Sequence, residues 1–143
     1  MRMNEFDQRL GTRRYPCVQF ATRTSPIFSD WYSRFYPGGS KSVPEEIDCW
    51  LDPQAVAIWL MDDGAADFAG VTFQTHNFEA NEVEHLAKVL RSRFSLTVTT
   101  RANRGRRIIY VKACSVESLR GIVEPYLLEG FEYKLQARRF RTP

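Results

Sequence analysis

The sequence contains few of the residues that build disulfide or metal-bound frameworks. Its three cysteines, Cys17, Cys49 and Cys114, are widely spaced and odd in number, and no CxxC pair occurs. This pattern argues against a disulfide framework and against a zinc site, and it favours a reducing, intracellular compartment. The two histidines, His76 and His85, are too few for a histidine-based metal or catalytic set, so we expect packing or surface roles for both.

Long hydrophobic runs are also missing. No stretch approaches the roughly 18 consecutive apolar residues of a membrane span, so we expect no membrane partner. The first seven residues lack the apolar segment of a signal peptide. With 143 residues, 43% of them hydrophobic and 26% charged, the chain is long enough for one globular domain with a real core.

Acidic residues are absent from two stretches that are rich in arginine and lysine. Residues 91–112 contain seven basic residues and no acid, and residues 134–143 contain four more basic residues without an acid. The acids gather instead in residues 79–84 and 117–132. Although the net charge is only +3, this segregation predicts one basic face, suited to nucleic acid, and one acidic face. The alternative is a basic stretch that is merely solvated.

The most informative stretch is residues 51–64, in which an apolar segment ends in two aspartates and a glycine. Asp52 is a favourable N-cap and Pro53 a favourable first residue, so a helix is expected to begin there. Residues 55–61 are apolar on every side of that helix, which predicts burial all round. The helix macrodipole disfavours carboxylates at its C-terminal end by roughly 0.3–1 kcal/mol each. A divalent cation would compensate them; two solvated acids are the alternative.

Residues 56–64, Val-Ala-Ile-Trp-Leu-Met-Asp-Asp-Gly, resemble the signature helix of the LAGLIDADG homing endonucleases, in the form common in second repeats. Upstream, residues 35–36 and 41–44 are similar to the linker that precedes a second repeat. Further stretches resemble the family in its own order, namely Val71–Thr75, Phe78 with Glu82, Val83 and Leu86, Ile108–Val111, Pro125–Leu127 and Tyr133–Leu135. The resemblance covers about residues 13–135.

The resemblance implies an α/β (α+β) fold, with an αββαββα repeat, a buried signature helix and an antiparallel sheet that binds nucleic acid. The residue patterns predict strands near 14–22, 71–75, 96–101 and 108–113, and helices near 53–63, 79–94 and 115–125. A further strand is expected within residues 67–70. An additional helix beginning at Ser25-Pro26 carries an aromatic stripe that we interpret as core packing, consisting of Phe28, Trp31, Tyr32 and Phe35.

Four segments are expected along the chain. Residues 1–12 are expected to form a flexible N-terminus, and residues 13–44 resemble the strand, helix and linker at the end of a first repeat. Residues 45–135 form the expected LAGLIDADG domain, and residues 136–143 a basic tail.

The resemblance implies a metal-dependent nuclease site at the end of the signature helix. Asp63 matches the family's metal-binding acid and would hold Mg²⁺, which prefers oxygen ligands. Asp62 is expected to offer its backbone carbonyl as a further metal ligand. Lys134 and Lys41 match the lysines of the family's basic pocket, and Gln74 matches a polar position that orders water. Asp63, Lys134, Lys41 and Gln74 are therefore the catalytic candidates, although each alone is more often a surface residue.

The outward positions of the predicted strands carry side chains suited to reading base edges in a major groove. These are Tyr15, Gln19, Thr72, Thr97, Thr99, Arg101, Arg106, Tyr110 and Lys112. A second set is expected to contact phosphates, which positions a protein without specifying a sequence. It consists of Arg104, Arg107, Arg138, Arg139 and Arg141.

An active member of the family needs two signature helices side by side, whereas this sequence contains one. A homodimer, or a separately made first half, would supply the second helix. The expected contact face consists of Val56, Ala57, Trp59 and Leu60. Left alone, this apolar helix would expose a surface that ought to be covered.

The expected function is site-specific cleavage of double-stranded DNA with Mg²⁺, in an organelle or in a bacterial or phage-infected cytoplasm. The alternative is a non-catalytic protein that binds structured RNA or ribosomal RNA, as a maturase-like factor or a component of a ribosome or other ribonucleoprotein. Cleavage requires Asp63 and a metal ion, whereas docking on RNA requires neither.

Overall fold

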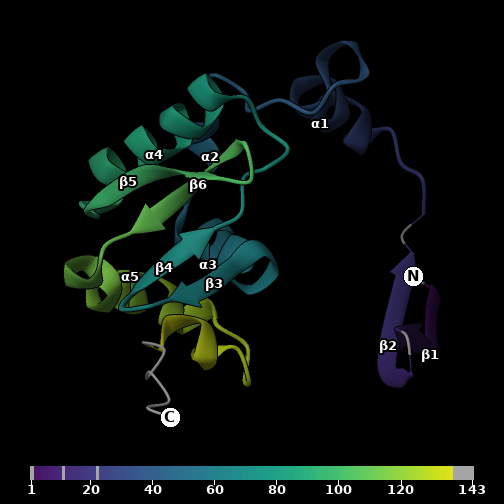
Figure 1. The fold of residues 1–143 in the computed structure, drawn as a ribbon. Helices are drawn as coiled ribbons and strands as arrows, with labels where there is room; N and C mark the ends of the chain where they lie inside the picture. Colours follow the sequence, from purple (N-terminus) through teal and green to yellow (C-terminus); the bar gives the residue numbers. More distant parts are fainter. Residues whose placement is uncertain (1, 11, 22, 137–143) are drawn as a thin grey trace. The chain divides into compact units, whose positions relative to one another are not determined.

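The computed structural model describes residues 2–10, 12–21 and 23–136, which divide into two compact units, Met1–Arg34 and Phe35–Pro143 (Figure 1). In the first unit, strand β1 (Arg2–Leu10) pairs antiparallel with β2 (Arg13–Ala21). Little regular structure was expected in residues 1–12. That expectation is wrong for Arg2–Leu10, because every residue of this segment has a cross-strand partner in β2.

Helix α1 (Ile27–Phe35) runs from the first unit to the boundary with the second. Its predicted aromatic stripe exists, but α1 contains no buried residue. Trp31 is 44% exposed and Phe28 53% exposed, so the interpretation of these side chains as core is wrong. Phe35 alone among the four packs against the core of the second unit.

The second unit follows the αββαββα order that the family resemblance implies (Figure 1). Its main elements are α2 (Ile47–Trp50), α3 (Pro53–Asp63), β3 (Gly64–Asp67), β4 (Gly70–Phe73), α4 (Ala80–Phe94), β5 (Val98–Asn103), β6 (Arg106–Val111) and α5 (Val116–Val123). Short 3₁₀ turns occur at Pro37–Gly39, Ala113–Ser115, Glu124–Tyr126 and Glu132–Leu135. The additional strand, expected at 67–70, is β3, and it begins directly after the signature helix α3.

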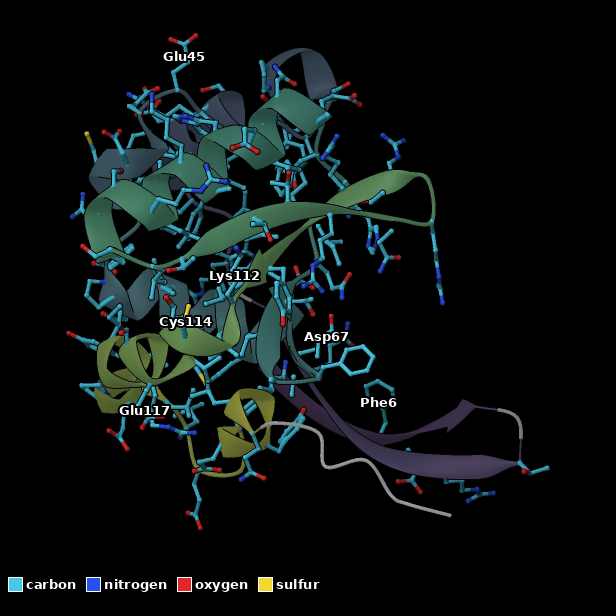
Figure 2. The ribbon with its side chains drawn as sticks, turned by 60° about the vertical axis from the view of Figure 1, so that its left-hand side comes forward. Phe6, Glu45, Asp67, Lys112, Cys114 and Glu117 are labelled. Carbon is cyan, nitrogen blue, oxygen red and sulfur yellow. The ribbon has the colours of Figure 1, made fainter. Side chains whose placement is uncertain are left out.

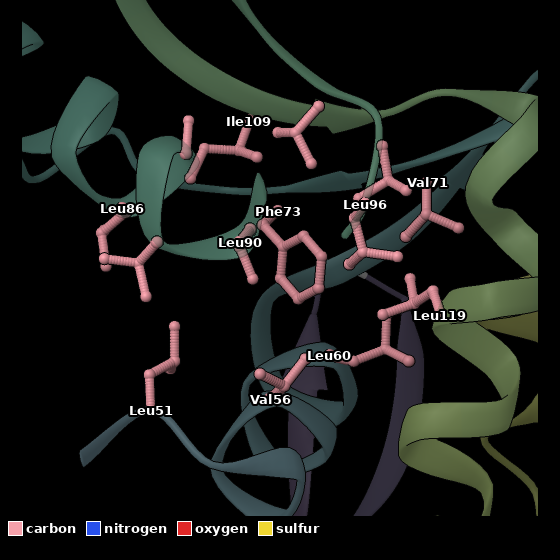
Figure 3. Close-up of a cluster of buried hydrophobic side chains, with 14 of the residues drawn as sticks. Leu51, Val56, Leu60, Val71, Phe73, Leu86, Leu90, Leu96, Ile109 and Leu119 are labelled. Carbon is pink, nitrogen blue, oxygen red and sulfur yellow. The ribbon is translucent and has the colours of Figure 1, made fainter. Parts of the chain in front are cut away.

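The four strands form one antiparallel sheet in the order β3-β4-β6-β5. One face of this sheet packs on the helices, because Phe73 and Ile109 join Leu60 of α3, Leu90 of α4 and Leu119 of α5 in the hydrophobic core (Figure 3). Side chains alternate between the two faces of a strand. The intervening residues therefore lie on the opposite side, which we call the outer face of the sheet.

The segment between α1 and α3 is hydrogen-bonded to the N-terminal end of α4. Phe78 and Val83 occupy the two positions of a hydrophobic staple at the start of α4, and Glu82 completes a capping box with the N-cap residue Glu79. The same Glu82 carboxylate accepts hydrogen bonds from the Ser42 hydroxyl at 2.6 Å and from the Val43 amide at 2.9 Å. Because of these bonds, the linker that follows α1 is part of the second unit.

Candidate functional site

Helix α3 begins and ends as its sequence predicts. The Asp52 carboxylate accepts a hydrogen bond from the Ala55 amide at 2.8 Å, and Pro53 is the first helical residue. At the other end, Gly64 continues in an extended conformation directly into β3. A Cβ atom at Gly64 would lie 2.5 Å from the Leu60 carbonyl oxygen, so glycine is required for close packing rather than for a left-handed turn.

The predicted metal-binding acids lie together at the C-terminal end of α3. Asp62 and Asp63 are both exposed, and they line a pocket of about 280 Å³ together with Lys41 and the apolar side chains of Trp59 and Leu51. Neither carboxylate has an ion-pair partner within 4.0 Å among the described residues. This arrangement leaves both carboxylates available to an added cation.

Lys134, which lies 73 residues after Met61 in the sequence, contacts the same end of α3. Its side chain is only 7% exposed, and Nζ donates hydrogen bonds to the carbonyl oxygens of Met61 at 2.5 Å and Asp62 at 3.1 Å. Burial lowers the pKa of Lys134 below its usual value, while the carboxylates of Asp62 and Asp63 raise it. Lys134 therefore compensates the negative end of the α3 dipole.

This contact bears on the expected role of Asp62. The Asp62 carbonyl oxygen accepts one bond from Lys134 and keeps a second lone pair, so its role as a further metal ligand stays a prediction. The exposed Asp62 carboxylate offers a second oxygen donor at the same helix end.

The two remaining catalytic candidates also lie near the end of α3. The Lys41 ammonium lies 4.9 Å from the centroid of the Phe78 ring, at the wall of the same pocket, whose lining is otherwise mostly apolar. Gln74 follows β4, and its backbone amide donates to the Asp63 carbonyl at 3.1 Å. The Gln74 Oε1 atom is buried and has no hydrogen-bond partner among the described residues.

These donors fit part of a magnesium site. The two exposed carboxylates of Asp62 and Asp63 are hard oxygen ligands of the kind that Mg²⁺ prefers, whereas Gln74 is not among the residues that line their pocket. Nevertheless, the described residues contain no cluster of three or more histidine, cysteine, aspartate or glutamate side chains. One chain therefore contributes two acids, and further ligands have to come from water, from a bound phosphate or from a second chain.

Several predicted DNA-reading residues lie on the outer face of the sheet. Thr99 pairs with Tyr110, and Arg101 pairs with Ile108, which places these side chains on that face. Thr97 and Lys112 follow the same alternation beyond the strand ends, and both are exposed. Lys112 is labelled in Figure 2.

Two of the outer-face predictions need correction. Thr72 is only 4% exposed, and its hydroxyl donates to the Ala65 carbonyl, so it is not available to a base. Tyr110 is 7% exposed, and the Arg101 guanidinium lies on its ring. Arg106 is exposed with a surface ion pair to Glu79 at 3.4 Å, so its contact with DNA stays a prediction.

The predicted phosphate contacts are only partly placed by the structure. Arg104 is exposed at the tip of the β5–β6 hairpin. Arg107 lies on the helix side of the sheet, where it donates to Thr100. Arg138, Arg139 and Arg141, and the Tyr15 side chain, lie outside the described part of the chain, whereas Gln19 is exposed on β2.

The predicted face for a second signature helix is also wrong. Val56, Ala57 and Leu60 are fully buried in the core of their own unit, and Trp59 is partly buried against it. The exposed stripe of α3 instead consists of Gln54, Ile58 and Asp62, which are spaced four residues apart, and Ile58 is 55% exposed.

Asp67, labelled in Figure 2, was not among the predicted site residues, and it forms an ion pair with Arg101 at 3.6 Å. This residue ends β3, the strand whose position the sequence misplaced. Once β3 is known to begin at Gly64, alternation places Asp67 on the outer face beside β4.

Comparison with known proteins decides the family. A family model described as the LAGLIDADG DNA endonuclease family matches residues 2–119. This chain belongs to the LAGLIDADG DNA endonuclease family. Its fold matches that of the homing endonuclease I-WcaI bound to its DNA recognition sequence, with a TM-score of 0.86 and 21% identity, over 97% of this chain and 66% of that one.

Curated relatives of this LAGLIDADG chain carry two kinds of name. "Cytochrome b mRNA maturase bI2" of Debaryomyces hansenii is 32% identical, with 82% of this chain and 46% of that protein covered. The protein of the same name from Saccharomyces cerevisiae is 35% identical, with 76% and 27% covered. "Intron-encoded endonuclease ai4" of Dictyostelium discoideum is 33% identical, with 82% and 76% covered. The chain thus spans less than half the length of either maturase relative.

Within the described residues, every helix is too short or too polar to cross a membrane.

Proposed function

We propose that this chain is one half of a site-specific, Mg²⁺-dependent endonuclease that cleaves double-stranded DNA. The observation that carries the proposal is the group of Asp62, Asp63 and Lys41 around one pocket at the exposed end of a buried helix. Lys134 compensates the helix dipole through the last carbonyls, but the two exposed carboxylates have no ion-pair partner in the described chain, which favours a further cation there.

Each residue has a distinct role in this proposal. When bound, Mg²⁺ stabilises charge on the scissile phosphate and lowers the pKa of a bound water. Asp63 holds the ion, with the Asp62 carboxylate beside it. The exposed Lys41 ammonium lies at the pocket wall, where it can attract a phosphate. Gln74 Oε1 can accept a hydrogen bond from an ordered water, and Lys134 fixes the helix end that carries the acids.

A second chain completes the centre in this proposal, as a homodimer or as a separate first half. The described chain contains one signature helix, α3, and the curated maturase relatives are more than twice as long as the matched segment. The exposed stripe of α3, which contains Ile58, is the surface that the signature helix of the second chain would contact.

RNA binding is the second candidate, because two relatives at 32% and 35% identity are named as mRNA maturases. In that case the outer face of the sheet and the hairpin arginines bind structured RNA, and the acids are not used. Relatives named for cytochrome b mRNA and for introns favour an organelle genome as the origin of this chain.

Asp63→Ala tests the assignment. The full chain, with any partner that co-purifies, is incubated with Mg²⁺ and a randomised duplex DNA library, and cleaved ends are sequenced while retained duplexes are counted. Asp63→Ala should abolish cleavage and leave DNA binding within about twofold, whereas Asp48→Ala, at an exposed aspartate of α2, should change neither.

Cleavage that survives Asp63→Ala would contradict the metal site. A wild-type chain that binds intron RNA and cuts no DNA would establish the maturase function instead.

A further inference from the structure

An arginine, a tyrosine and an aspartate from three strands meet on the outer face of the sheet. The Arg101 guanidinium carbon of β5 lies 3.2 Å from the centroid of the Tyr110 ring on β6. The Arg101 Nη1 atom lies 3.6 Å from Asp67 Oδ2 at the end of β3. The two contacts limit the freedom of a long side chain that is still 45% exposed.

The fourth strand of the sheet is shaped to hold the Tyr110 ring. A Cβ atom at Gly70, in β4, would lie 2.4 Å from the Tyr110 Cζ and hydroxyl oxygen atoms. Only glycine leaves room for the ring at this point, and the ring in turn is the surface on which the Arg101 guanidinium lies. Stacking of this kind favours arginine over lysine, because the guanidinium is planar.

The charge of Arg101 is balanced, yet its N–H donors are not used within the described chain. A distance of 3.6 Å to Asp67 is too long for a charge-assisted hydrogen bond. By contrast, Arg91 donates to the Val98 carbonyl and to Glu84, and Arg107 donates to Thr100. Arg101 therefore offers donors without offering a net positive charge.

We propose that Arg101 is a specificity-determining residue that donates two hydrogen bonds to O6 and N7 of a guanine in the major groove. Tyr110 and Asp67 are positioning residues that hold the guanidinium for this contact. This inference rests on the proposed function, because it takes duplex DNA as the ligand. Guanine suits the site because it presents two neutral acceptors that match the guanidinium fork.

A phosphate is the competing ligand for an arginine, and Asp67 disfavours it. A phosphate would bring a negative charge close to the Asp67 carboxylate, whereas a guanine edge is uncharged. Asp67 thereby lowers non-specific affinity for DNA while leaving the base contact possible, which raises discrimination between sequences.

The test is selection from a randomised duplex DNA library by the full chain, with any partner that co-purifies, followed by sequencing. Arg101→Lys keeps the charge but loses the fork, so the preference for guanine at one position should fall roughly ten- to a hundredfold, with other positions unchanged. Arg104→Ala is the control on the same hairpin. It should weaken all sequences alike and reduce the slope of log affinity against log salt by about 1.

Two further variants test the positioning residues. Tyr110→Phe keeps the ring and should keep the guanine preference, whereas Tyr110→Leu should lose it. Asp67→Asn should increase binding to unselected DNA and steepen the salt dependence, while the guanine preference decreases. A role for Asp67 in stability alone would move neither the salt slope nor the sequence preference.

The outcomes separate this inference from the proposed function. If the wild type selects a sequence and Arg101→Lys keeps every preference, or weakens all sequences equally, Arg101 is not a base reader, although DNA remains the ligand. If the wild type selects no duplex sequence at all, both proposals are wrong.

Discussion

Helices α1 and α3 both carry large apolar side chains, but only α3 buries them within this chain. In α3, Val56 and Leu60 have no exposed surface, whereas in α1 Ile27 is 67% exposed and Trp31 44% exposed. The difference lies in what each unit supplies. The sheet and α5 pack on α3, whereas the described part of the first unit contains no element beyond the β1–β2 hairpin that could cover α1. Apolar periodicity identifies a helix face, and the surrounding elements decide whether that face becomes core.

The largest expected effect is the difference between Leu60→Ala and Ile27→Ala, which remove side chains of equal size. Leu60→Ala should lower the free energy of unfolding by roughly 2–5 kcal/mol, because it leaves a cavity between α3 and the sheet. Ile27→Ala should change it by about 0.5 kcal/mol or less, since most of that side chain is already in water. Urea unfolding of both variants measures the difference.

Equal losses in the two variants would contradict the comparison, because they would mean that α1 is covered in solution as completely as α3.

Local sequence signals predicted most of the second unit. Asp52 and Pro53 mark the start of α3, and Phe78 and Val83 mark the start of α4, because caps and staples depend on neighbouring residues alone. Strand β3 was misplaced because Gly64 is extended and leads directly from α3 into the sheet, with no intervening turn. That choice depends on space near Leu60, which no local pattern encodes.

The acidic end of α3 was predicted from the family resemblance, and the structure places Asp62, Asp63 and Lys41 at one pocket. The family resemblance associated Lys134 with the site, but no sequence pattern indicated that it donates to the last carbonyls of α3, because the two segments are more than 70 residues apart. Nor did it indicate the pairing of Asp67 with Arg101, which requires the register of all four strands.

Lys134→Met removes the cation that compensates the end of α3, while α1 has no comparable buried cation. The variant should lose about 2 kcal/mol of stability, because the Met61 and Asp62 carbonyls lose their donor. Lys88→Met, at an exposed lysine of α4, is the control and should change stability by less than about 0.5 kcal/mol. Thermal unfolding of the two variants measures this.

Unchanged stability in Lys134→Met together with lost DNA cleavage would assign Lys134 a direct chemical role, as the family resemblance implies, in place of the helix-end role.

Glu82→Gln should give the smallest effect, and it tests why the linker after α1 belongs to the second unit. Burial of the Glu82 carboxylate raises its pKa, but hydrogen bonds from the Ser42 hydroxyl and the Glu79 and Val43 amides outweigh burial and lower the pKa below 4.5. The folded state therefore binds the proton less tightly than the unfolded state does. The resulting stability is present above the unfolded pKa and is lost as the pH falls through the folded pKa.

At pH 7, Glu82→Gln should cost about 1 kcal/mol, because glutamine keeps one acceptor but loses the charge. The difference between wild type and variant should shrink as the pH is lowered below about 4.5, as measured by urea unfolding at a series of pH values. Glu117→Gln, at an exposed glutamate of α5, should show no such trend. If the difference in free energy of unfolding between wild type and Glu82→Gln stays constant down to pH 3, Glu82 stabilises the linker through packing. Its charge then plays no part in the contact between the linker and α4.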